Sequence, residues 1–311
     1  MRPSLSVDIA PGRKNSLVLK NPVMPASGCF SWGQEFARHF DISALGAVVS
    51  KGVTMAPRQG NPQPRVAETP AGMLNSIGLQ NIGIDACISD MAPIWTRWDV
   101  PVIVNVAGDT VEEFGEMARM LDGVPGIAAI ELNISCPNVD MGGIEIGQDV
   151  GASARATRAA VRNTDLPVIV KITPNVTDPV SLARACEAEG AAAICAINTV
   201  LGLAIDVRRQ RPVLPRARGG LSGPAIKPIA LRIVYDIARA VNVPIIGCGG
   251  VGSGQDAVEF LMAGATAVQV GTATFANPRA LLDVIEGLEA WMSANGVADV
   301  NDLIGASFRS A

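Results

Sequence analysis

The sequence has little of what several common kinds of enzyme chemistry require. Among its 311 residues there is one histidine, His39, and aromatic residues make up only 4%. Without a second histidine or one near a cysteine motif, the sequence argues against a Cys-His-Asn hydrolase. The six cysteines form no CxxC pair and no metal-ligand spacing, so neither a metal site nor an iron–sulfur cluster is expected within this chain.

Charged residues are also few, at 17%, and the formal net charge is −4. Because no long basic run is present, nucleic acid is not expected as a partner. The segment Met1–Pro22 has no apolar stretch long enough for a signal peptide or a membrane span. Together with unpaired cysteines, this predicts a cytoplasmic protein without membrane attachment. One arginine cluster is either a solvated loop or a subunit or anion contact: Arg208, Arg209, Arg211, Arg216 and Arg218.

Hydrophobic residues make up 49% of the chain and recur in short Val- and Ile-rich runs. Runs of this kind are typical of strands buried on both faces of a parallel sheet. Eight strands are expected, at Pro22–Ala26, Ala47–Ser50, Val102–Asn105, Ile130–Ile134, Val168–Ile172, Ala193–Ile197, Pro244–Gly247 and Ala267–Val270.

Amphipathic helices are expected between these strands. Thr110 and Glu113 form a capping-box pattern at the start of one, and Gly190 follows the end of another. The expected helices are Thr110–Leu121, Ala152–Arg162, Asp178–Glu189, Pro224–Val241, Gln255–Ala263 and Pro278–Ala294. Eight alternations favour a closed α/β fold, a (β/α)8 TIM barrel formed by one domain over residues 1–311, over an open doubly wound sheet.

Two connections are long, Gly52–Gly78 and Leu201–Gly223, and both follow strands. We expect both on the catalytic face of the barrel, where they are functional or carry small added strands.

Polar residues gather where the expected strands end, which is where barrels of this type place their chemistry. Lys171 lies inside a Val/Ile strand, and a lysine there is costly unless something pairs with it. It either forms a buried pair with Glu131 on the neighbouring strand or faces an anionic ligand. Lys51, after Val48-Val49-Ser50, poses the same question.

Glycine pairs follow the last two strands, at Gly249-Gly250 and Gly271-Thr272. Backbone N–H groups at these positions often bind phosphate in barrels, although simple turn glycines would look the same. Cys136 differs from the other cysteines because it follows a strand end and precedes a proline. A cysteine placed there could reach a substrate as an acid–base group or nucleophile.

Several motifs together resemble the dihydroorotate dehydrogenase family over nearly the whole chain. They are Asn133-Ile134-Ser135-Cys136-Pro137-Asn138, Met24-Pro25-Ala26-Ser27-Gly28-Cys29-Phe30, Asn75-Ser76-Ile77-Gly78-Leu79-Gln80-Asn81, Gly247-Cys248-Gly249-Gly250-Val251 and Gly271-Thr272. The cysteine at position 136 and the absence of an N-terminal extension resemble the class 1 enzymes. The segment Asn138–Gly143, with Gly147, resembles class 1B.

The resemblance implies oxidation of (S)-dihydroorotate to orotate in de novo pyrimidine synthesis, with one FMN per chain. It implies that Cys136 is the base and that Lys51 lies between flavin and substrate. Implied flavin-binding residues are Ser27, Lys51, Gly52, Asn105, Asn133, Lys171, Ile197, Gly223, Gly249, Gly250, Gly271 and Thr272. Implied substrate-binding residues are Lys51, Asn75, Ser76, Ile77, Gly78, Leu79, Asn133, Asn138, Asn198 and Thr199.

Class 1B resemblance further implies a homodimer core and a partner subunit that holds FAD and a [2Fe–2S] cluster and passes electrons to NAD. Three alternatives stay open at this point. They are a fumarate-linked class 1A enzyme, a flavoenzyme similar to dihydropyrimidine dehydrogenase, and, in a different class, an aldolase with Lys171 as its Schiff-base lysine. A relative without activity is disfavoured because Cys136, Lys51 and Lys171 are all present.

Overall fold

The computed structural model describes residues 2–134 and 146–309. Its central feature is an eight-stranded parallel sheet in the order β3-β16-β15-β10-β9-β8-β7-β4. The strands are β3 (Val23–Pro25), β4 (Val48–Val49), β7 (Val102–Val106), β8 (Ala129–Asn133), β9 (Val168–Ile172), β10 (Ala193–Ala196), β15 (Ile245–Cys248) and β16 (Ala267–Val270). Each predicted strand is confirmed to within one residue at either end.

The sheet closes on itself between its two outermost strands, β3 and β4. The Gly46 N–H donates to the Val23 carbonyl oxygen at 2.9 Å. A Cβ on Gly46 would lie 2.0 Å from the Asn21 carbonyl oxygen, so only glycine allows the backbones to approach this closely. The predicted (β/α)8 TIM barrel is therefore confirmed, and the open sheet is excluded.

Side chains alternate between the two faces of the barrel wall. On β9, Val168, Val170 and Ile172 belong to the core that packs under the helices, whereas Ile169 belongs to the core inside the barrel. The surrounding helices are α3 (Val111–Leu121), α4 (Val150–Val161), α5 (Pro179–Ala188), α6 (Lys227–Ala238), α7 (Gly254–Met262) and α9 (Ala280–Ala294). The Thr110 hydroxyl accepts from the Glu113 N–H at the start of α3, so the predicted cap is confirmed.

Some elements differ from the sequence predictions. The single helix expected over Pro224–Val241 is a 3-10 turn, η5 (Pro224–Ile226), followed by α6. The segment between β4 and β7 was not predicted to be helical, but it contains three short helical parts. Its parts are α1 (Ile84–Ala86), η3 (Cys87–Met91) and α2 (Ala92–Trp95). The other short helices are η1 (Phe36–Arg38), η2 (Ile42–Ala44), η4 (Ile146–Gln148), α8 (Ala273–Ala276), η6 (Val300–Leu303) and α10 (Ala306–Arg309).

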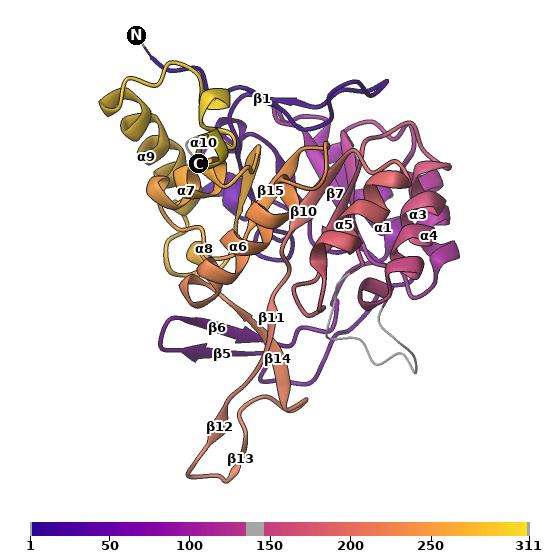
Figure 1. The fold of residues 1–311 in the computed structure, drawn as a ribbon. Helices are drawn as coiled ribbons and strands as arrows, with labels where there is room; N and C mark the ends of the chain where they lie inside the picture. Colours follow the sequence, from indigo (N-terminus) through magenta and orange to yellow (C-terminus); the bar gives the residue numbers. More distant parts are fainter. Residues whose placement is uncertain (1, 135–145, 310–311) are drawn as a thin grey trace.

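The two ends of the barrel are covered differently (Figure 1). The hairpin of β1 (Val7–Asp8) and β2 (Val18–Leu19) lies at the N-terminal end, where Ile9 and Leu19 are buried against the interior core. The two long connections form added strands at the C-terminal end, as expected: β5 (Val66–Thr69), β6 (Gly72–Asn75), β11 (Val200–Leu203), β12 (Ile205–Asp206), β13 (Arg211–Pro212) and β14 (Arg218–Ser222). Across residues 2–134 and 146–309, no helix has the length and apolar character to span a membrane.

Candidate active site

A group of polar side chains lies inside the barrel toward the C-terminal ends of the strands. Lys171 on β9 is 4% exposed and Glu131 on β8 is fully buried. They are joined through Gln269 on β16, which lies three strands from β9 around the barrel. Lys171 Nζ donates to Gln269 Oε1 at 2.8 Å, and Gln269 Nε2 donates to Glu131 Oε2 at 2.6 Å. The structure thus places an amide between the two charges that the sequence left as a possible direct pair.

The environment of Lys171 favours its protonated form. Burial by itself lowers the pKa of this lysine, but the acidic groups of Cys248, Cys195 and Glu131 more than offset that and raise it above its ordinary value. A Schiff-base lysine must be a neutral amine, which requires a lowered pKa. The raised pKa therefore argues against the aldolase alternative and favours a protonated Lys171.

Three asparagines at the ends of β7, β8 and β10 form a row beside these charges. Asn133 Nδ2 donates to Asn105 Oδ1 at 3.5 Å, and Asn198 Nδ2 donates to Asn133 Oδ1 at 3.4 Å. A Cβ on Gly52 would lie 3.0 Å from Asn105 Oδ1 and 3.4 Å from Leu79 Cδ2. The structure therefore brings together these five predicted residues, which come from five separate segments of the chain.

Lys51 follows β4 at the same end of the barrel. Its backbone N–H donates to the Ser31 carbonyl oxygen, and its side chain is partly buried. Burial and the nearby Arg65 lower the pKa of Lys51, with Glu35 acting in the opposite direction. Among the described residues, no carboxylate lies within ion-pair distance of Lys51. A partly buried cation without such a partner is suited to an anionic or amide-containing ligand.

The two glycines after β15 form a cradle and have positive φ angles. Gly249 has φ +131° and Gly250 has φ +80°, which only glycine adopts readily. A Cβ on Gly250 would lie 2.7 Å from Lys227 Cβ and 3.0 Å from the Gly223 carbonyl oxygen. Within the described part of the chain, the N–H groups of Gly249, Gly250 and Val251 donate to no other backbone group. These donors fit a phosphate group such as that of FMN.

Gly223 and Thr272 join the same cradle. A Cβ on Gly223 (φ +93°) would lie 3.4 Å from Thr272 Cγ2, and the Thr272 hydroxyl donates to Ser222 Oγ at 2.8 Å. A Cβ on Gly271 would lie 3.3 Å from Ala26 Cβ and 3.4 Å from Cys29 Sγ, and the Cγ1 atom of the buried Ile197 lies 3.6 Å from a Cβ built on Gly249. The predicted flavin residues Ile197, Gly223, Gly249, Gly250 and Thr272 are therefore neighbours, and Ser27 lies two residues after the end of β3.

The predicted substrate loop runs from Asn75 to Leu79 over the same end. Asn75 Nδ2 donates to the Gly220 carbonyl oxygen, and the Ser76 hydroxyl accepts from Asn61 Nδ2 at 2.9 Å. The first bond ties the start of the loop to β14, and the second ties it to Asn61, earlier in the same connection. Thr199 is held by its own N–H, which donates to Asn198 Oδ1 at 2.7 Å.

Two predicted residues, Cys136 and Asn138, lie outside the described residues. Gln269 was missed as a site residue, although a glutamine in the buried run Ala267-Val268-Gln269-Val270 is a signal of the same kind as Lys171 in its strand. Glu131 was considered only as a partner for Lys171. The carboxylate that joins the charged group to the asparagine row, through Asn105 Nδ2 at 2.7 Å, could not be deduced from one strand at a time.

Comparison with known proteins bears directly on this geometry. Residues 14–292 match the family model described as dihydroorotate dehydrogenase. The chain belongs to the dihydroorotate dehydrogenase family. The match includes the strand ends, the cradle and the loop over Asn75–Leu79, so the family resemblance noted in the sequence is confirmed.

Full-length relatives define the subclass within the dihydroorotate dehydrogenases. A protein of Trichlorobacter lovleyi is 53% identical over 98% of this chain and 99% of its own length. One of Desulforamulus reducens is 52% identical over 92% and 94%, and one of Geobacter sulfurreducens is 50% identical over 98% of both. All three are named dihydroorotate dehydrogenase B (NAD(+)), catalytic subunit. The class 1B resemblance is therefore confirmed at the level of subclass.

Proposed function

We propose that this chain oxidises (S)-dihydroorotate to orotate in de novo pyrimidine synthesis, as the catalytic subunit of an NAD-linked enzyme. The observation that carries the proposal is the end-to-end similarity to catalytic subunits of that name. The site agrees with it, because a buried cation, a row of amides and a glycine cradle meet at one end of the barrel. FMN, bound with its phosphate in the cradle, would supply the acceptor for the hydride from C6 of the substrate.

The protein residues have separate tasks in this proposal. Cys136 removes the proton from C5 of dihydroorotate, a weakly acidic position that needs a placed base. Lys51 lies between substrate and flavin, where its partly buried ammonium stabilises negative charge that develops during the reaction. Lys171 faces the pyrimidine end of the flavin and stabilises its reduced, anionic form.

Amides serve the substrate because its ring presents both hydrogen-bond donors and acceptors. The residues proposed to bind it, besides Lys51, are Asn75, Ser76, Ile77, Gly78, Leu79, Asn133, Asn138, Asn198 and Thr199. The residues proposed to hold FMN are Ser27, Lys51, Gly52, Asn105, Asn133, Lys171, Ile197, Gly223, Gly249, Gly250, Gly271 and Thr272.

The proposal extends to the assembly. The relatives' shared name describes a catalytic subunit, which favours a partner chain that carries electrons onward. We propose that the partner holds FAD and a [2Fe–2S] cluster, that two catalytic chains form the core of the assembly, and that it works in the cytoplasm. We propose that this chain contributes one domain, residues 1–311, and that the FAD and iron–sulfur sites belong to the partner.

Purification of the chain tests the proposal. It predicts a yellow protein with one FMN per chain that dihydroorotate bleaches without added partner. Bleaching by dihydrouracil with no response to dihydroorotate would instead favour the dihydropyrimidine dehydrogenase alternative. Turnover with fumarate in the absence of any partner would favour class 1A. NAD reduction that appears only when an iron–sulfur flavoprotein co-purifies would support class 1B.

Replacement of the proposed base gives a sharper test. Cys136→Ala should leave FMN bound and slow flavin reduction by dihydroorotate about 100-fold or more, because general-base catalysis contributes about 10²- to 10⁴-fold. Cys87→Ala, at a buried cysteine in the outer core, is the matched control and should reduce at the native rate. Near-native reduction of Cys136→Ala in a stopped-flow experiment would remove Cys136 from the mechanism.

A further inference from the structure

One carboxylate inside the barrel is the end point of two separate chains of hydrogen bonds. Glu131 Oε2 accepts from Gln269 Nε2, which is the amide that also accepts from Lys171. Glu131 Oε1 accepts from Asn105 Nδ2 at 2.7 Å. The first chain therefore leads to the cation proposed to face the flavin, and the second leads to the asparagine row proposed to bind flavin and substrate.

The direction of every hydrogen bond in the two chains follows from Glu131. A carboxylate only accepts and an ammonium only donates, so the Gln269 amide between them has one allowed orientation. On the other side, Asn105 must turn its NH2 group toward Glu131, which leaves its oxygen to accept from Asn133. Asn133 in turn presents its oxygen to Asn198 at 3.4 Å. Reversal of any one amide would place two donors or two acceptors against each other.

The cost of the arrangement indicates that it is not there for stability alone. Glu131 is fully buried and Lys171 nearly so, and buried polar networks are favourable only when every member is paired. Hydrophobic side chains of similar volume often stabilise a fold as well as a buried ion pair does. A neutral amide interposed between the charges adds a position at which the network could fail, but it also fixes where each charge lies.

We infer that Glu131 is a positioning residue that sets, through Gln269 and Asn105, the orientation of both the flavin-facing cation and the substrate-facing amides. The inference rests on the proposed function and goes beyond it, since Glu131 and Gln269 contact neither ligand in that proposal. Gln269 lies only in the hydrogen bonds that lead from Glu131 to Lys171, and Asn105 lies in those that lead from Glu131 to the asparagine row. The two sets of hydrogen bonds can therefore be disturbed separately.

The test compares variants of the FMN-loaded protein by two readouts besides turnover. One is the affinity of orotate for the oxidised protein, measured by titration of the flavin absorbance. The other is the FMN midpoint potential, which reports the ratio of the affinities for reduced and oxidised FMN. For this two-electron couple a tenfold change in that ratio corresponds to about 30 mV.

Glu131→Gln keeps the side-chain shape but can donate as well as accept. It therefore no longer sets the direction of the hydrogen bonds through Gln269 or through Asn105. Orotate should bind about tenfold more weakly, because mispaired buried amides lose hydrogen bonds. The same variant removes a negative charge near Lys171, so the ratio should move about tenfold in favour of reduced FMN and the potential should rise. Gln269→Met should lower the potential, because Lys171 loses its acceptor, and leave orotate affinity within about twofold.

Val268→Ala is the matched control, because Val268 neighbours Gln269 on β16 but packs in the outer core under the helices. It should lower thermal stability without changing the potential or orotate affinity. If Glu131→Gln does not fold, the two single variants Asn105→Val and Gln269→Met are compared instead. They test the same separation between the effect on orotate binding and the effect on the potential. Asn105→Val should weaken orotate binding and shift the potential less than Gln269→Met does, because Asn105 is also among the residues proposed to hold FMN. Gln269→Met should shift the potential and leave orotate affinity near its native value.

Two results would overturn the inference. One is a Glu131→Gln protein with native orotate affinity and native potential. The other is equal loss in both readouts for Gln269→Met and Asn105→Val, which would mean general loosening of the barrel. Failure of the proposed function would give a different result from failure of this inference. The native protein would then lack FMN, or dihydroorotate would not reduce its flavin.

Discussion

The interior of the barrel has two layers that come from the same strands, two residues apart. The layer toward the N-terminal end is hydrocarbon and includes Ile103, Ile169 and Ile246, all 1% exposed or less. Two positions further along the same strands stand Asn105, Lys171 and Cys248. Because strand side chains alternate between the two faces, residues two positions apart both point into the barrel. The interior therefore changes from hydrocarbon to polar or charged side chains over two residues of each strand.

The two layers differ in what they contribute: the hydrocarbon layer stabilises the fold, and the polar layer carries groups proposed to act on flavin and substrate. The hydrocarbon layer needs only shape and volume, and it is sealed from solvent by the hairpin of β1 and β2. The polar layer requires a specific partner for every group. A change in the first should therefore cost stability with little effect on chemistry, whereas a change in the second should do the opposite.

The largest expected effect tests the hydrocarbon layer. Ile169→Ala should reduce the free energy of unfolding by about 2–5 kcal/mol, because it removes a buried side chain from a packed core and leaves a cavity. The FMN midpoint potential should stay at its native value. Urea unfolding with Ile169→Val as the graded control, expected to cost about 0.5–1.5 kcal/mol, checks the first part. A large shift of the potential in Ile169→Ala would break the division between the layers.

The next effect tests the polar layer two residues along the same strand. Lys171→Met should weaken reduced FMN relative to oxidised FMN tenfold or more, because the cation that stabilises the reduced ring is lost. This ratio corresponds to a fall of about 30 mV in the potential, or about 1.4 kcal/mol. Lys227→Met, at a partly exposed lysine, is the control and should leave the potential unchanged. An unchanged potential in Lys171→Met would contradict the role proposed for this lysine.

The two layers were not equally predictable from the sequence. The strands could be predicted because parallel strands buried on both faces are continuous Val and Ile runs, such as Val168–Ile172. The eight strand–helix alternations favoured a closed barrel but did not by themselves exclude an open sheet, because closure depends on the approach of Gly46 to Val23, a contact between two segments with no periodic signal. The helical segment between β4 and β7 was missed because a π-helical turn, Cys87–Met91, interrupts its periodicity.

In the candidate site, the residues at strand ends could be named one strand at a time. Lys51, Lys171 and the glycines were found in this way, since each is unusual in its local context. Their mutual connection could not be found, because the hydrogen bonds through Gln269 cross the barrel from β16 to β8 and β9. Chain order gives no measure of distance across a closed barrel.

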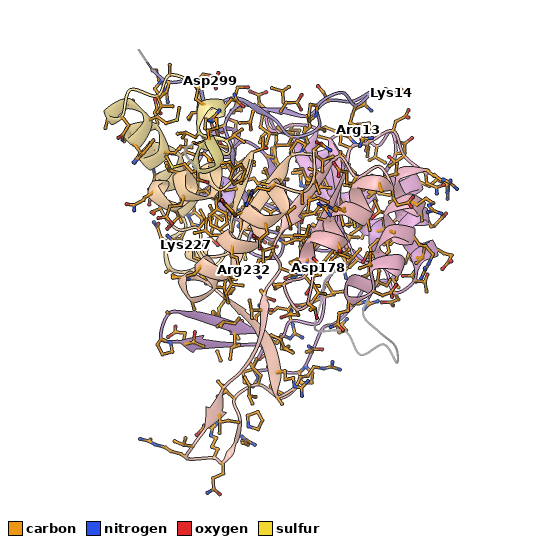
Figure 2. The ribbon with its side chains drawn as sticks, in the orientation of Figure 1. Arg13, Lys14, Asp178, Lys227, Arg232 and Asp299 are labelled. Atoms are coloured by element: carbon orange, nitrogen blue, oxygen red, sulfur yellow. The ribbon has the colours of Figure 1, made fainter. Side chains whose placement is uncertain are left out.

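The smallest expected effect concerns charged side chains at the rim of the barrel, which contrast with the charged side chains inside it. Lys227 (Figure 2) forms ion pairs with Asp256 at 2.6 Å and Glu259 at 2.9 Å, and these side chains are 18–36% exposed. Burial alone would raise the pKa of Asp256, but hydrogen bonds from Lys227, Ser253 and the Gly252 N–H lower it below 3.8. Because solvent screens such pairs, Asp256→Asn should cost about 0.5–1 kcal/mol of unfolding free energy at pH 7.

The pH dependence of this loss separates the rim from the interior. A carboxylate with a lowered folded-state pKa contributes its stability above the unfolded value of 3.8 and loses it as the pH falls through the folded value. Native protein and Asp256→Asn should therefore differ in unfolding free energy at pH 7 and converge as the pH falls below 3.8 and through the folded-state pKa. FMN potential should be native in the variant throughout. A constant difference at all pH values would mean that Asp256 acts by packing, and a shifted potential would mean that rim charge also tunes the flavin.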